Sequence, residues 1–136
     1  MEEKLIKQLM KKQNNLKSQL EKIGREIESR EKEVSRLKYL KDSMSNLDED
    51  LEGSEVLSQF GEGIFIKTKL KDIKSFIVNV GSNVFIEKDR DGLKDTLKDL
   101  REMSKKEKEK LEESYNQLKE SFDEINKDIR RMTNKK

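Results

Sequence analysis

Apolar residues recur at alternating intervals of three and four over residues 4–51, and this heptad repeat constrains the fold more than any other feature. With Ile6 as position a, ten of the fourteen a and d positions are apolar. Such a repeat predicts a long helix that buries one narrow seam against a partner helix, as in a coiled coil. No proline interrupts it, and Gly53 is a suitable C-cap, so we expect the helix to end near residue 52.

A second heptad segment is expected after Asp89-Arg90-Asp91, in which both aspartates are candidate N-caps, to about residue 133. Its apolar spacing is regular from Leu111 onward, but the polar run 104–110 interrupts the seam and predicts weaker packing there. Two helices of similar length, connected through the segment 53–88 that leaves them side by side, are expected to pair in antiparallel orientation. In that pairing Arg30, at a d position, is expected to lie near Glu112 or Glu113.

Between the two heptad segments the hydrophobic period changes from about 3.5 to 2. β-branched and aromatic runs flank short turns at 61–63 and 81–83, which predicts two β-hairpins and a four-stranded meander. The hairpins repeat with a period of 20, because Gly61 matches Gly81 and Phe65 matches Phe85. Gly63 matches Asn83, and both residue types tolerate positive φ. The expected fold is α+β, with helical segments at 1–52 and 89–136 and the hairpins at 53–88.

Composition limits what this chain can do. Hydrophobic residues make up 31% and charged residues 44%, against about 45–50% and about 25% in an ordinary soluble domain. The absence of cysteine and histidine excludes thiol catalysis, histidine triads and the usual zinc sites, so we expect no enzyme, cofactor or metal. No apolar run approaches the roughly 18–20 residues of a membrane span, and the N-terminus lacks a signal peptide's apolar stretch. We therefore expect a cytoplasmic protein with no membrane partner.

The hairpins predict assembly. Their strands carry apolar residues on both faces and leave sheet edges open, which a solvated sheet avoids. We expect hairpins from several subunits to close a β-barrel body, and favour this over a monomer whose helices fold over the sheet. The residues assigned to assembly are Phe60, Gly61, Gly63, Ile64, Phe65, Ile66, Val78, Val80, Gly81, Asn83, Val84, Phe85 and Ile86.

The order helix, hairpin, hairpin, helix, with the segments 59–66 and 78–88, resembles an α-class subunit of prefoldin. The doubled hairpin is the most specific feature, since β-class subunits carry one. The resemblance implies a hexamer of two α-class and four β-class subunits, in which a double β-barrel bears six coiled coils. It also implies an ATP-independent chaperone that holds unfolded proteins and passes them to a group II chaperonin. Asn83 departs from the family's usual second turn glycine, and an archaeal subunit and a eukaryotic paralogue both remain open.

The free end of the helix pair, residues 1–10 and 125–136, which we call the tip, is the expected client-binding surface. Leu5 and Met10 lie outside the seam and widen its apolar face, and exposed apolar surface on a fraying end suits varied partners. The residues assigned to client binding are Leu5, Ile6, Leu9, Met10, Ile125, Ile129 and Met132.

Charge is uneven along the chain. Residues 1–20 hold five lysines and two glutamates, whereas residues 48–62 hold six acids and no base. A basic tip could steer the protein toward an acidic partner such as a chaperonin rim. The net charge of +2 and the few aromatic residues argue against nucleic acid. The alternatives are a passive coiled-coil scaffold with an oligomerising β module, and a tRNA-binding coiled-coil arm, which would need a basic stripe that we did not find along the rod.

Overall fold

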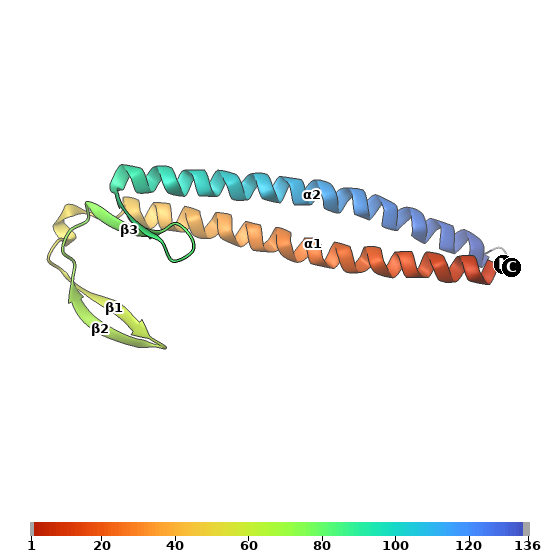
Figure 1. Ribbon diagram of the computed structural model, residues 1–136, viewed down its shortest axis with the longest axis horizontal. Helices are drawn as coiled ribbons and strands as arrows, with labels where there is room; N and C mark the ends of the chain where they lie inside the picture. Colours follow the sequence, from red (N-terminus) through yellow and green to blue (C-terminus); the bar gives the residue numbers. More distant parts are fainter. Residues whose placement is uncertain (1, 135–136) are drawn as a thin grey trace. The chain divides into compact units, whose positions relative to one another are not determined.

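A computed structural model describes residues 2–134. Along the chain lie α1 (Glu2–Ser45), a 3₁₀ turn (Glu49–Leu51), β1 (Glu55–Gly61), β2 (Ile64–Lys69), β3 (Ser75–Asn79), β4 (Phe85–Asp89) and α2 (Arg90–Asn134) (Figure 1). The expected α+β architecture, two long helices with two hairpins between them, is confirmed. The outermost residues of the expected helical segments, 1, 135 and 136, lie outside the described residues. By internal contacts the chain divides into one unit with residues up to 34 and from 102 onward, and a second unit with residues 35–101.

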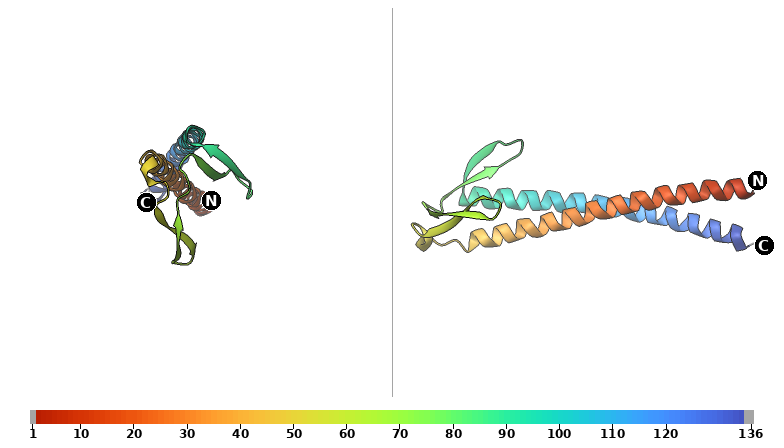
Figure 2. Two further views of the ribbon diagram at one scale, coloured as in Figure 1. Left: turned by 90° about the vertical axis from the view of Figure 1, so that its left-hand side faces the viewer. Right: turned by 90° about the horizontal axis from the view of Figure 1, so that it is seen from below.

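In the first unit the two helices run antiparallel (Figure 2). The Gln13 amide donates a hydrogen bond to the Asn126 side chain, and Arg30 Nη1 lies 3.1 Å from Glu107 Oε2. In each pair the two residue numbers add to nearly the same value, as expected when two antiparallel helices keep one register. The expected pairing of Arg30 with Glu112 or Glu113 is wrong, because Glu107 is the acid that this register brings level with Arg30.

The seam of α2 is unbroken, which corrects the expected interruption at 104–110. Arg101, Ser104 and Lys108 continue the spacing of four and three, and Ser104 is buried at 6% exposure. The polar run therefore fills the seam with small and charged side chains and does not open it. The seam positions of α2, all partly or fully buried, are Leu97, Arg101, Ser104, Lys108, Leu111, Tyr115, Leu118, Phe122, Ile125, Ile129 and Met132.

In the second unit α1 ends at Ser45, seven residues before the expected end at residue 52. The guanidinium of Arg90, the first residue of α2, donates hydrogen bonds from Nη2 to the carbonyl oxygens of Met44 (2.8 Å) and Leu47 (2.7 Å). The Met44 carbonyl belongs to the last turn of α1, whose carbonyls lack intrahelical partners, and Leu47 lies two residues beyond the helix end. The seam also weakens here, because Lys41 is exposed. Gly53 has φ of +81° but follows the 3₁₀ turn and does not cap α1.

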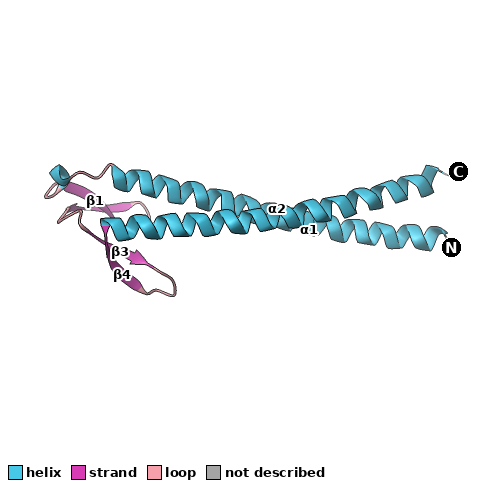
Figure 3. Cartoon of the chain, turned by 90° about the horizontal axis from the view of Figure 1, so that it is seen from above, coloured by secondary structure: helices cyan, strands magenta, loops and turns pink. Residues whose placement is uncertain are grey.

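The strands form two separate two-stranded antiparallel sheets, β1–β2 and β3–β4, and not the expected four-stranded meander (Figure 3). The segment 70–74 between them leaves the ladder, and its Ile73 is buried at 2% exposure. The Ile73 backbone N–H donates to Glu52 Oε1, while the Asp72 carboxylate accepts hydrogen bonds from the next two backbone N–H groups that follow Ile73. Burial of Ile73 thus ends one hairpin before the next begins, and each sheet keeps two open edges.

Both turns have the same backbone conformation, as the period-20 repeat predicts. Positive φ occurs at Glu62 and Gly63 in the first turn, and at Ser82 and Asn83 in the second. Two central residues with positive φ are what a type I′ hairpin turn requires. Gly61 and Gly81, which match in the repeat, also have positive φ, +157° and +117°. The equivalence of Gly63 and Asn83 is confirmed as well.

Candidate functional site: the hairpin faces and the tip

The first hairpin exposes apolar side chains on both faces. The register pairs Leu57 with Lys67 and Gln59 with Phe65 on one face, and Ser58 with Ile66 on the other. Phe60 is the extra residue of a bulge between Gln59 and Gly61, and it is 74% exposed. Large exposed apolar side chains are costly in an isolated hairpin, so both faces need a partner surface.

The second hairpin repeats this arrangement with one difference. Ile77 and Phe85 lie on one face and are 76% and 60% exposed. On the opposite face Phe76 and Val78 are half-buried. Lys88, also on that face, donates from Nζ to the Thr96 hydroxyl of α2 at 2.7 Å. One face of this hairpin is therefore partly covered within the chain, and the other is free.

The structure exposes most of the residues assigned to assembly, but their role in assembly is not tested by it. Val78 is the half-buried exception among the apolar ones. The sequence argument missed Leu57 and Ile77, which are repeat equivalents and among the most exposed apolar residues of the chain. Leu57 and Ile77 lie two residues before Gln59 and Asn79. Side chains two residues apart on a strand share a face, so the strand pattern is sufficient to predict their position. The exposed assigned residues with large apolar side chains are Phe60, Ile64, Phe65, Ile66, Val80, Val84, Phe85 and Ile86.

At the described part of the tip, the seam residues Ile6, Leu9, Ile125, Ile129 and Met132 are half-buried. Leu5 and Met10 lie outside the seam and are 48% and 49% exposed. The distinction drawn from the heptad pattern between seam and off-seam residues is thus confirmed. Their client-binding role remains a prediction.

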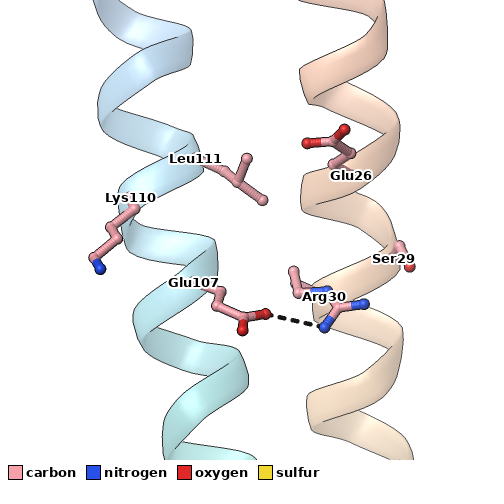
Figure 4. Close-up of a pocket in the computed structure, with 6 residues that line it drawn as sticks. All are labelled: Glu26, Ser29, Arg30, Glu107, Lys110 and Leu111. Carbon is pink, nitrogen blue, oxygen red and sulfur yellow. Dashed lines mark hydrogen bonds and ion pairs between the residues drawn. The ribbon is translucent and has the colours of Figure 1, made fainter.

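Charged side chains bridge the helices at the polar part of the seam (Figure 4). Beside the Arg30–Glu107 pair, Lys108 Nζ lies 3.2 Å from Glu31 Oε1 and 3.6 Å from Glu112 Oε1. The hydrogen bond that Lys108 donates to Glu31, more than the charge of Glu112, raises the pKa of Lys108 above its ordinary value. Next to these pairs a groove of about 510 Å³ opens between the helices, lined by Glu26, Ser29, Arg30, Glu107, Lys110 and Leu111.

The groove is lined by two acids, Glu26 and Glu107, and two bases, Arg30 and Lys110, so its formal charges balance. Within residues 2–134 no cluster of three or more acidic side chains, histidines or cysteines is placed to hold a metal ion. In that same part of the chain, no helix is long and apolar enough to cross a membrane.

Comparison with known proteins agrees with this geometry. The family model described as "Prefoldin subunit" matches residues 3–135. The chain is 33% identical to "Prefoldin subunit alpha" of Methanobrevibacter smithii over 93 residues, which is 66% of this chain and 61% of that protein. It is 32% identical to "Prefoldin subunit alpha" of Methanococcus aeolicus over 52% of each chain. These matches thus span between half and two thirds of the relatives' lengths, and they bear out the α-class resemblance.

The fold also matches a solved structure. A chain in the cryo-EM structure of filamentous PFD from Methanocaldococcus jannaschii superimposes with a TM-score of 0.50 and 19% identity, covering 98% of this chain and 99% of that one. At this identity the match concerns the fold alone.

Proposed function

Since the chain belongs to the prefoldin family, we propose that it is an α-class subunit of an ATP-independent chaperone that holds unfolded proteins. The observation that carries the proposal is the pair of exposed apolar surfaces, one on the hairpins and one at the tip. We propose that the hairpins bind β-class subunits in a hexamer of two α-class and four β-class chains. The tip then holds the client, and the complex delivers it to a group II chaperonin in the cytoplasm.

The tip suits the holding of unfolded chains. Leu5 and Met10 are half exposed and lie outside the a and d positions of the seam. Methionine is flexible and polarizable, which favours contact with varied apolar sequences. Holding by apolar contact needs no nucleotide, and the basic charge around the tip would favour an acidic chaperonin rim.

A double substitution tests the role of the tip. The complex with β-class subunits is mixed with a denatured test protein, and its aggregation is followed by light scattering without ATP. Leu5→Ser with Met10→Ser should weaken protection at least about threefold, because roughly half of each apolar side chain is lost from the exposed surface. Met103→Ser is the matched control, since Met103 is a 57% exposed helix residue away from the tip.

Deletion of residues 1–10 and 125–136 is a second variant, expected to weaken protection while the hexamer persists. Equal protection by the wild-type and tip-altered complexes would refute the tip as the client-binding surface. It would favour the alternative, a passive coiled-coil scaffold.

A further inference from the structure

The outer surface of α1 carries a row of mostly basic residues that lies outside the seam and extends beyond the tip. Positions that recur every seventh residue, on the side opposite the seam, contain no acid, and all of them are exposed. We call these positions the basic row: Lys4, Lys11, Ser18, Arg25 and Lys32. It spans 28 residues, or about 42 Å at 1.5 Å per residue. The expectation of no basic stripe along the rod, which rested on total charge by segment, is wrong, although a tRNA-binding arm would still have no use for the doubled hairpin.

The charges beside the row leave its sign unchanged. Two lysines, Lys7 and Lys22, and two glutamates, Glu21 and Glu28, flank it and cancel. Only Lys32 has an ion pair among those that the structure gives for the row, a 3.3 Å contact with Glu28 in which both side chains remain more than 60% exposed. The outer surface of α2 is acidic over residues 102–124. It holds two lysines, Lys106 and Lys110, and six acids, Glu102, Glu109, Glu113, Glu120, Asp123 and Glu124. The helix pair of this unit is thus basic on one side and acidic on the other.

The geometry points to an acidic, unfolded polypeptide segment as the ligand of the basic row, an inference that rests on the proposed holding function and names the class of client. Row positions are about 10.5 Å apart. A polyproline II-like chain, a major conformer of unfolded polypeptides, advances about 3.1 Å per residue with three residues per turn. Carboxylates at every third residue therefore lie on one side about 9.3 Å apart, close to the spacing of the row. Lys4 adjoins the exposed Leu5, so a chain gripped at the tip can continue along the row.

Two other anionic ligands fit less well. Single-stranded nucleic acid is held by aromatic side chains that stack on bases, and residues 2–34 of α1 contain no aromatic residue. A membrane surface binds helices whose apolar face is free, whereas the apolar face of α1 is in the seam. An acidic peptide needs neither feature.

Binding of a defined probe tests the inference. A fluorescent polyglutamate peptide of about twenty residues is titrated with the full chain in its β-class complex, and anisotropy is measured at low salt. Lys11→Gln, Arg25→Gln and Lys32→Gln together should weaken binding roughly tenfold, because three charge contacts are lost. Glutamine is a good helix former, and an unchanged circular dichroism spectrum confirms that α1 persists. Molar salt should abolish binding by the wild type.

The matched control is Lys105→Gln, Lys106→Gln and Lys110→Gln on α2, which removes the same net charge from exposed positions and should change affinity less than about twofold. Any of three outcomes would overturn the inference. They are an equal loss of affinity in both triple variants, no binding of polyglutamate, and tighter binding of a twenty-nucleotide oligo-dT. Protection of an uncharged denatured client should be unaffected in the row variant. Failure of the wild-type complex to protect any client would instead overturn the proposed function, whatever the peptide shows.

Discussion

At the scale of single residues, Arg90 shows how one side chain can determine where a distant helix ends. Its guanidinium donates to the Met44 carbonyl in the last turn of α1 and to the Leu47 carbonyl just beyond the helix, and a longer 3.4 Å contact reaches the carbonyl of Ser45. A cation at this position also faces the negative end of the helix dipole. The backbone of Arg90 follows directly from β4, where Asp89 Oδ1 accepts the Gly92 N–H at 2.7 Å and caps α2. One junction therefore ends one helix and starts the other.

We predict that Arg90→Met lowers the free energy of unfolding by about 1–3 kcal/mol, because methionine keeps the aliphatic stem and loses charged hydrogen bonds to partly buried carbonyls. Urea unfolding followed by circular dichroism measures the change. Lys94→Met, an exposed substitution on the same helix, is the control and should stay within about 0.5 kcal/mol of wild type. The same stability in Arg90→Met as in the control would show that solvent satisfies these carbonyls equally well.

At the scale of elements, the local signals were predictable and the long-range ones were not. Both helices and both hairpins follow from periodicity and turn residues, because these act within a few positions of the chain. The end of α1 at Ser45 depends on Arg90, forty-five residues later, and no local pattern reveals it. The separation of the two sheets likewise depends on burial of Ile73. The tip residues were found because off-seam positions follow from the heptads, whereas Leu57 and Ile77 needed the strand register.

The turns give a prediction at this scale. Gly63 and Gly81 have φ of +80° and +117°, and a Cβ built at either position meets no atom within 4 Å. Gly63→Val with Gly81→Val should therefore act through backbone strain alone, about 1–3 kcal/mol at each turn. We expect the double variant to lose assembly with β-class chains in size-exclusion chromatography with light scattering, while far-UV circular dichroism stays strongly helical.

Asn83→Gly is the matched control for the turn variants, since glycine adopts the +58° φ of Asn83 without strain. It should assemble normally. A full complex in the double valine variant would mean that the turns are not conformationally required. Loss of helix together with assembly would mean that the helices depend on the hairpins.

At the scale of the whole molecule, the exposed apolar area of the hairpins is the main unsolved packing problem of the isolated chain. Four strand edges are open, and large apolar side chains are exposed on both faces of the first hairpin. The two helices do not supply a compact core, since only Leu20, Leu37, Met44, Ile73 and Leu97 are buried hydrophobic residues among those described. Association with other chains is the available way to cover this surface.

We predict that the purified chain alone forms oligomers or aggregates at micromolar concentration, and that a β-class partner converts them to one species of defined mass. Light scattering before and after co-expression measures both states. Leu57→Ser with Ile77→Ser should reduce self-association, because it removes two of the most exposed apolar side chains. A stable wild-type monomer at these concentrations would contradict the assembly proposal.

The polar layers of the helix seam have a consequence for folding. Arg30, Glu31, Glu107 and Lys108 satisfy one another in a single alignment of the two helices. A slide of one heptad toward the C-terminus of α2 would set Arg30 beside Leu111 and Tyr115 and leave its charge without a counter-ion. An all-leucine seam would accept such a slide at little cost, whereas a polar layer rejects it. The charged residues in the middle of the seam thus favour the correct alignment when α1 and α2 pair, and they lower the stability of the helix pair somewhat.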